Sequence, residues 1–153
     1  MIECPYLLLA RRAILDVLTR QLSVVDVVDG LEFGNVHEFR LNEGKHGSLL
    51  VPLNPEVQMI ISVRRSAETK PGWYPLELAA HLPDGAEGME RHPISADLTD
   101  GEVTRVQVTL KSMALREEGV YSFSVRDPET DSVLQSASMV VHIGDQEPEG
   151  QNP

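Results

Sequence analysis

Apolar and polar residues alternate with period two through the second half of this sequence, and this alternation limits the possible folds most. Apolar side chains recur at every second position in five segments, with polar or charged side chains between most of them. Such a pattern buries one face of a strand and leaves the other face in water, as in antiparallel sheets. The segments are residues 57–63, 76–82, 106–110, 121–125 and 133–143.

The first part of the chain predicts a long hairpin. Residues 5–33 carry two apolar runs on either side of a polar centre at 18–21. The second run, 22–31, is rich in valine, whose β-branched side chain suits a strand. Residues 10–18 fit a strand or a short helix, and periodicity does not decide between the two. A polar loop over 34–48 precedes a short apolar piece at 49–53.

Turn-forming residues separate these segments, and the count is about seven strands with little helix. The chain reads as irregular between Pro83 and Gly101. A length of 153 residues fits one domain. We therefore predict an all-β fold, an antiparallel two-sheet sandwich over residues 1–143, followed by an acidic, disordered tail at 144–153.

Residues 115–125 resemble the corner before strand F of immunoglobulin-like domains. There an acidic residue, a glycine and a tyrosine take alternate positions, here Glu117, Gly119 and Tyr121. The resemblance implies an immunoglobulin-like sandwich with a tyrosine corner, in which the Tyr121 hydroxyl bonds back to the backbone. Phe123 stands where secreted members carry a disulfide cysteine, which suits a reduced, intracellular version.

Residues 5–33 are also similar to the start of a family of functionally uncharacterised bacterial proteins. Its members begin with an apolar strand, a polar hairpin tip like residues 19–23 and a strand like residues 24–28. This likeness implies a bacterial β-sandwich of unknown role and brings no catalytic residues.

The charge and the single cysteine suggest the setting in which the chain works. A net charge of −11 repels polyphosphate, so we expect no nucleic-acid partner. Cys4 has no second cysteine to pair with, which favours a reducing compartment. Glu3 does not fit a signal peptide, and no run reaches the roughly 18 apolar residues of a membrane helix. We expect a cytoplasmic protein with no membrane partner.

The sequence predicts no metal, no cofactor and no catalytic residue. The histidines are scattered without HExxH spacing, although two of them share the loop at 34–48. Asp97, Asp100 and Glu102 lack the spacing of an EF-hand loop. Cys4 has no activating motif beside it, and the GxSxG, P-loop and GxGxxG motifs are absent. The histidines are His37, His46, His81, His92 and His142.

Acidic residues interrupt the valine-rich run of the hairpin. Asp26 and Asp29 lie among valines, and Glu32 follows them. An acid in such a run is either exposed or paired across the hairpin. We favour a cross-strand ion pair of Asp26 with Arg11 or Arg12, and a functional acid is the alternative.

One loop-to-strand junction suggests a contact surface. Trp73 and Tyr74 follow Pro71-Gly72, and tryptophan is favoured at binding hot spots. The alternative is that Trp73 caps the core. Arg64, Arg65 and Lys70 lie near the same loop and give it a local positive charge.

These patterns favour a non-catalytic bacterial module that acts through protein–protein binding. Free edge strands would also permit a homodimer by sheet extension. One alternative is a sandwich that binds a small ligand, or acts as an enzyme, in a pocket between its sheets. Another is an acidic inhibitor, similar to an antitoxin, that masks a basic site.

Overall fold

The computed structural model describes residues 1–16, 18–19, 21–34 and 44–144, and within these residues the chain forms strands and no helix. The all-β prediction is therefore confirmed. The strands are β1 (Ile2–Leu15), β2 (Leu22–Val27), β3 (Gly30–Phe33), β4 (Leu49–Arg65), β5 (Trp73–His81), β6 (His92–Asp97), β7 (Val103–Leu115), β8 (Gly119–Arg126) and β9 (Val133–Ile143).

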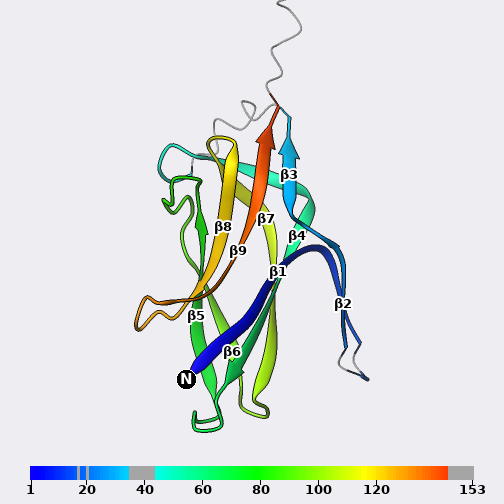
Figure 1. Ribbon diagram of the computed structural model, residues 1–153, viewed down its shortest axis with the longest axis vertical. Coiled ribbons are helices and arrows are strands. Elements are labelled where there is room, and N and C mark those ends of the chain that lie inside the picture. Colours follow the sequence, from blue (N-terminus) through cyan, green and yellow to red (C-terminus); the bar gives the residue numbers. More distant parts are fainter. Residues whose placement is uncertain (17, 20, 35–43, 145–153) are drawn as a thin grey trace, which may run out of the picture.

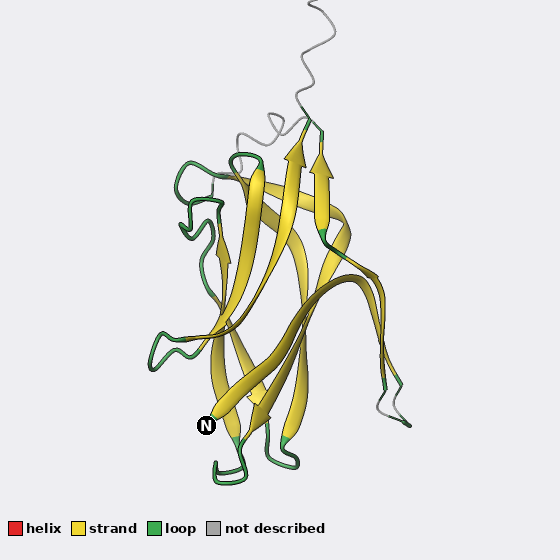
Figure 2. Cartoon of the chain, viewed as in Figure 1, coloured by secondary structure: helices red, strands yellow, loops and turns green. Residues whose placement is uncertain are grey.

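The strands form two sheets (Figure 1). The four-stranded sheet has the order β2-β1-β4-β7 and is antiparallel throughout. The five-stranded sheet has the order β3-β9-β8-β5-β6, and its β3–β9 pair is parallel. The sandwich is thus mixed and contains nine strands in the described residues, so the expectation of about seven antiparallel strands was wrong. Figure 2 shows the loops at the ends of these strands.

The parallel pair arises where the chain passes from one sheet to the other. We expected one strand over 22–31, but β2 ends at Val27 and β3 then pairs with β9. Asp26 adopts a left-handed conformation with a φ of 54°, which aspartate tolerates better than valine does. Gly30 permits the close approach of β3 to β9, because a Cβ there would lie 3.0 Å from the carbonyl oxygen of Val140.

Two further differences concern strand boundaries. Strand β6 lies in the stretch that we expected to be irregular. It is short, pairs only with β5 and buries just Ile94 and Ala96, so its alternation is too brief to stand out. The segments at 49–53 and 57–63 belong to one strand, β4, whose register with β7 shifts between Pro52 and Val57.

The core fills the space between the sheets and uses the alternating positions. Val57, Met59, Ile61 and Val63 of β4 are all fully buried, as the alternation predicts. Val133 is an exception, since half of its side chain is exposed. The largest fully buried side chains are Tyr121, Phe123, Met59, Ile60, Ile61, Leu98, Met113, Leu115 and Met139.

The corner before β8 has the geometry expected of a tyrosine corner. The Tyr121 hydroxyl donates to the Glu117 carbonyl oxygen at 2.6 Å and accepts the backbone N–H of Arg116 at 3.0 Å. Gly119 has a φ of 147°, and a Cβ there would meet Pro83 at 3.1 Å. The bond and the glycine together hold the chain as it enters β8.

The predicted hairpin is present, and its first arm is a strand. β1 pairs with β2 as far as the Leu15–Leu22 pair, which rules out a helix over residues 10–15. The predicted disordered tail falls on residues 145–153, which lie outside the described residues, and on Gly144, whose N–H donates to Phe33 at 2.6 Å.

Candidate functional site

The end of the β1–β2 hairpin projects away from the two sheets (Figure 1). We call residues 11–27 the hairpin arm. Its apolar side chains are unusually exposed, with exposed fractions of 50% for Ile14, 41% for Val25, 56% for Val27 and 95% for Leu18. None of the arm residues that the structure describes belongs to the hydrophobic core or packs against it. The arm is therefore an apolar surface without a covering layer.

The arm presents its apolar side chains on a regular strand pair. Arg12 lies opposite Val25, and Ile14 lies opposite Ser23, so these side chains share one face. Asp16 supports the turn, because its carboxylate accepts the N–H groups of Leu18 at 2.9 Å and Thr19 at 3.1 Å. These hydrogen bonds lower the pKa of Asp16 below its ordinary value. The described residues of the arm thus form a strand pair and turn hydrogen bonds without packing against the core.

The expected ion pair of Asp26 is not formed. Asp26 is exposed and lies in no ion pair among the described residues. Arg11 instead donates to the carbonyl oxygen of Pro55 at 2.7 Å. Asp26 has a left-handed backbone, and in the register of β1 with β2 the residues on either side of it have cross-strand partners, while Asp26 itself has none among the described residues.

A second surface lies between the two sheets at the other end of β1. A groove of about 630 Å³ runs between residues 1–5 and the loop and strand residues 127–134. We call it the edge groove. Residues 2–9 of β1 pair only with β4, and residues 133–139 of β9 pair only with β8. Within the described residues no further strand pairs with these two edges, and β1 and β9 contact each other along them.

The side chain of Gln135 crosses from one edge to the other. Its Nε2 donates to the carbonyl oxygens of Cys4 at 3.2 Å and Pro5 at 3.3 Å. Its Oε1 accepts the backbone N–H of Ser136 at 3.0 Å. One side-chain amide thus forms hydrogen bonds with backbone groups of both β1 and β9. Elsewhere in a sheet, such backbone groups bond to the backbone of a neighbouring strand.

The predicted contact surface at Trp73 is only partly assembled. Trp73 is exposed over 67% of its surface, so it does not cap the core. Arg64 donates through Nε to Glu3 at 3.2 Å, and Arg65 donates to the carbonyl oxygens of Leu98 and Thr69. Both guanidinium groups are therefore engaged within the domain and do not form a free positive patch beside Trp73.

The remaining members of that surface point to a structural role. The half-buried Tyr74 donates through its hydroxyl to the carbonyl oxygen of Lys70, which ties the loop to β5.

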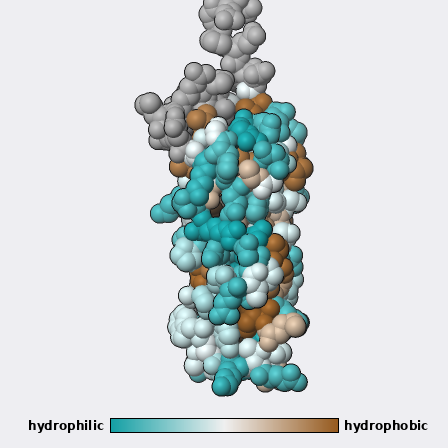
Figure 3. Space-filling view, turned by 90° about the vertical axis from the view of Figure 1, so that its left-hand side faces the viewer, coloured by the Kyte–Doolittle hydropathy of each residue, from teal (hydrophilic) through white to brown (hydrophobic). Residues whose placement is uncertain are grey.

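Figure 3 shows the side of the molecule that faces away from the hairpin arm. Hydrophobic areas on that side are small and separated by hydrophilic ones, so it offers no continuous apolar surface.

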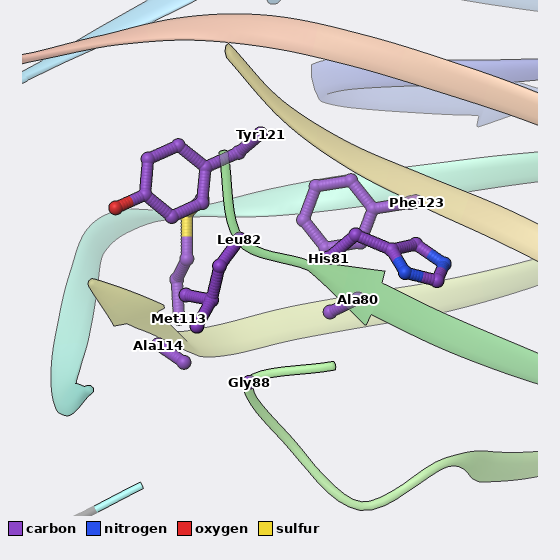
Figure 4. A pocket seen from close by; sticks show the side chains of 8 residues that line it. All are labelled: Ala80, His81, Leu82, Gly88, Met113, Ala114, Tyr121 and Phe123. Carbon is purple, nitrogen blue, oxygen red and sulfur yellow. The ribbon is translucent and has the colours of Figure 1, made fainter. Parts of the chain in front are cut away.

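The interior offers little room for a ligand. A cavity of about 10 Å³ lies at one end of the core, which is close to the smallest volume that holds one water molecule. Figure 4 shows apolar side chains around it, including Tyr121, Phe123 and Met113, while the imidazole ring of His81 points away. Ligand pockets are typically about 300–1,000 Å³, so this enclosed cavity is too small for a ligand.

A polar network covers part of the outer face of the five-stranded sheet. Arg91 bonds Glu87 at 2.7 Å and Asp131 at 2.7 Å, and these contacts lower the pKa values of both carboxyl groups. His81 Nε2 lies 2.9 Å from the Ser124 hydroxyl, but Ser124 is only 3% exposed. A buried hydroxyl cannot reach a substrate, so we interpret this pair as structural.

The described residues hold no group of three or more metal-ligating side chains. His37 lies outside them. Burial raises the pKa of the Cys4 thiol to about 11, so the thiol stays protonated and unreactive near neutral pH. Within the same residues, no helix is long and apolar enough to cross a membrane.

The sequence analysis found the hairpin but not the exposure of its apolar side chains. Ile14 and Val25 look like core residues, because an exposed valine in a strand has the same local signal as a buried one. Gln135 has no local signal either, since its partner Cys4 lies 131 residues away in the chain.

Comparisons with known proteins identify no family for the chain. No family model and no curated protein matches the chain. The structure is similar to part of a β-glucosidase from Kluyveromyces marxianus, with 13% identity and a TM-score of 0.41 over 57% of this chain and 13% of that one. It is also similar to part of a mutant β-glucosidase from Listeria innocua in complex with laminaribiose, with 9% identity and a TM-score of 0.43 over 94% of this chain and 16% of that one.

The chain spans only a small share of either enzyme, so neither likeness carries an argument about activity. The similarity of residues 5–33 to uncharacterised bacterial proteins stays a prediction.

Proposed function

We propose that this domain is a non-catalytic, immunoglobulin-like β-sandwich module that binds another protein through the hairpin arm. The observation that supports this function is the exposure of Ile14, Val25 and Val27 on an ordered strand pair that lies outside the core. Exposed apolar patches of this kind are typical of protein–protein contact sites. The edge of β2 that faces away from β1 is also open to pairing with a strand.

The charge of the arm indicates the kind of surface that fits it. Residues 11–27 contain three arginines and two aspartates, a net charge of +1, whereas the whole chain carries −11. Arg12 is exposed beside Val25 on the apolar face. A partner surface with an apolar centre and an acidic rim complements this arrangement. The proposal includes the bacterial cytoplasm as the compartment, which the single, buried Cys4 supports.

The test is affinity capture from the source cells with matched variants. The double variant Val25→Thr/Val27→Thr keeps the shape and the β-propensity of the arm but makes its surface polar. The control is Val103→Thr/Val120→Thr. It changes two valines outside the hairpin arm, in β7 and β8, that are each 55% exposed. We expect one protein in stoichiometric amount with the native chain and the control, and at least tenfold less of it with the arm variant.

Recovery of the same protein in equal amounts by the arm variant would contradict the proposal. Capture that disappears in high salt would also contradict it, because an apolar contact survives salt while an acidic inhibitor loses its basic partner. If the chain sediments alone as a dimer and the arm variant sediments as a monomer, the partner is a second copy and the arm is still the interface.

A further inference from the structure

The outer edge of β2 carries a further inference, which rests on the proposed function of the hairpin arm and deepens it. We propose that the arm binds its partner by strand addition, in which an extended segment of the partner protein, with apolar and acidic side chains, pairs with Leu22–Val25 of β2. The arm then contributes backbone hydrogen bonds as well as apolar surface to the contact.

The open backbone groups of β2 follow from one hydrogen bond at the end of the hairpin. The N–H of Asp16, just after β1, donates to the carbonyl oxygen of Gln21 at 2.9 Å. The C=O and N–H of one trans peptide unit point in opposite directions, so the N–H of Leu22 points away from β1. Because backbone groups alternate in direction along a strand, the N–H and C=O of Val24 also point away from β1. An added strand finds donors and acceptors at these two residues.

Among the described residues no strand occupies that side of β2. β2 is the outermost strand of its sheet and pairs with β1 only, and Figure 1 shows no strand on its far side. Proteins usually protect such an edge with lysine, proline or a bulge. Leu22–Val25 contains neither residue, and its register with β1 is continuous. The backbone becomes irregular only afterwards, at the left-handed Asp26, so the added strand pairs along Leu22–Val25 and ends there.

The side chains near this edge define the chemistry of the segment. Val25 is 41% exposed, and its cross-strand partner Arg12 is exposed on the same face. Arg12 takes part in no ion pair among the described residues. An apolar side chain of the added strand covers Val25, and a carboxylate on the same face lies within reach of the long Arg12 side chain. A second copy would bring another arm of net charge +1, so an acidic segment of a different protein is the better complement.

The first test uses a fluorescent peptide of about eight residues in which valine and glutamate alternate, and measures its anisotropy on the full chain. Two isomers carry N-methyl groups, one on every valine nitrogen and one on every glutamate nitrogen, so each has one edge that cannot donate hydrogen bonds. An added strand pairs through one edge only. We therefore expect one isomer to bind like the unmodified peptide and the other to bind about tenfold more weakly. A peptide with lysine in place of glutamate should not bind.

The second test changes the edge of the protein. Val24→Pro removes the outward N–H, and proline is tolerated on the free side of an edge strand. We expect it to weaken binding of the unmodified peptide about tenfold, whereas Val24→Thr keeps the N–H and should bind within about twofold of the native chain. Hydrogen exchange at the N–H of Ser23, which points to β1, checks that the hairpin of the Val24→Pro variant stays paired.

Two further measurements locate the charge and the contact. Arg12→Gln should weaken binding about threefold and flatten its salt dependence, while Lys111→Gln in β7 should leave binding unchanged. In the complex, the N–H groups of Leu22 and Val24 should exchange about tenfold more slowly than in the free chain, because each gains an acceptor. The exchange of Ser138 in β9 should stay the same.

This inference and the proposed function can fail separately. If Val25→Thr/Val27→Thr loses the captured partner while Val24→Pro keeps it, the arm is the interface but its edge is not, and strand addition is wrong. If both variants keep the partner, the arm is not the interface and the proposed function itself fails.

Three results with the isolated chain would overturn strand addition of an acidic segment. The first is equal binding of the two N-methylated isomers, which indicates contact through side chains alone. The second is no binding of the unmodified peptide by the folded native chain. The third is a dimer in sedimentation that Val24→Pro converts to a monomer, which shows that a second copy occupies the edge.

Discussion

The body of the sandwich, which is the two sheets without the hairpin arm, contains the same kinds of apolar residue as the arm. The body buries these side chains, whereas the arm exposes them. Val57, Val63 and Val125 in the body are fully buried, whereas Val25 and Val27 in the arm are 41% and 56% exposed. β1 runs through both regions, with Leu9 buried in the body and Ile14 exposed in the arm. The difference lies in the opposite sheet, which covers the first half of β1 and does not reach the arm (Figure 1).

Apolar strand content and membership of the core are therefore separate properties. A valine contributes to folding stability in proportion to the apolar surface that is removed from water, so a valine covered by a second layer contributes most. In the arm the same side chain remains free to contribute to the binding of another molecule. Matched substitutions in the two regions therefore measure how much each region contributes to folding.

The largest effect is expected in the body, from Phe123→Ala. Phe123 is 1% exposed and packs in the core between the sheets. Removing a buried ring should lower the free energy of unfolding by about 3–5 kcal/mol, through lost burial and the cavity left behind. Urea denaturation followed by tryptophan fluorescence measures the loss. Val120→Ala on the outer face is the matched control and should cost less than about 0.5 kcal/mol. Equal losses would break the distinction between the body and its surface.

The body was also the region that the sequence predicted well. Alternation placed the strands around Met59, Leu78, Phe123 and Met139, and these side chains are buried as expected. Period two is a local signal, because each strand shows its buried face to a core on one side. The Glu117–Tyr121 corner was readable for the same reason, since both ends of its hydrogen bond lie four residues apart.

The candidate binding surfaces could not be predicted from the sequence, because they depend on contacts between residues that are distant in the chain. Nothing near Gly30 indicates that β3 pairs in parallel with β9, more than a hundred residues later in the chain. Nothing near Ile14 shows that the opposite sheet stops short of it. Trp73 and Arg65 looked like one surface from their spacing, yet the Arg65 guanidinium turns to the carbonyl oxygens of Leu98 and Gly101.

The next effect in size is expected from Tyr121→Phe at the corner. The substitution removes the hydroxyl that donates to Glu117 at 2.6 Å and accepts from Arg116 at 3.0 Å, while the ring stays in the core. We expect a loss of about 1–2 kcal/mol in the free energy of unfolding. Chemical denaturation at neutral pH measures it. A loss as large as that of Phe123→Ala would mean that the ring, and not the hydroxyl, had been disturbed.

A smaller effect is expected on acidification, from the network around Arg91. Hydrogen bonds from Arg91 lower the pKa values of Glu87 and Asp131 in the folded state. A lowered folded pKa contributes stability above the unfolded value near 4, and this contribution is lost as the pH falls through the folded pKa. Stability should therefore decrease below about pH 4, modestly because the groups are exposed to solvent. Arg91→Gln should make the decrease shallower in urea denaturation between pH 7 and pH 2.5, and an unchanged slope would contradict this account.

The smallest effect is expected in the arm, and one substitution made in both regions measures it. Val27→Thr places a hydroxyl on a side chain that is 56% exposed, whereas Val63→Thr places it on a fully buried one. A hydroxyl buried without a partner costs about 1–3 kcal/mol, while an exposed one remains hydrated. We expect Val63→Thr to lower the free energy of unfolding by that amount and Val27→Thr to change it by less than about 0.5 kcal/mol. If Val27→Thr instead destabilises the isolated chain as much as Val63→Thr does, the arm is already covered in solution by a second copy or by the body. A near-zero change together with lost capture of a partner would show that the apolar surface of the arm is retained for binding, since it contributes nothing to folding.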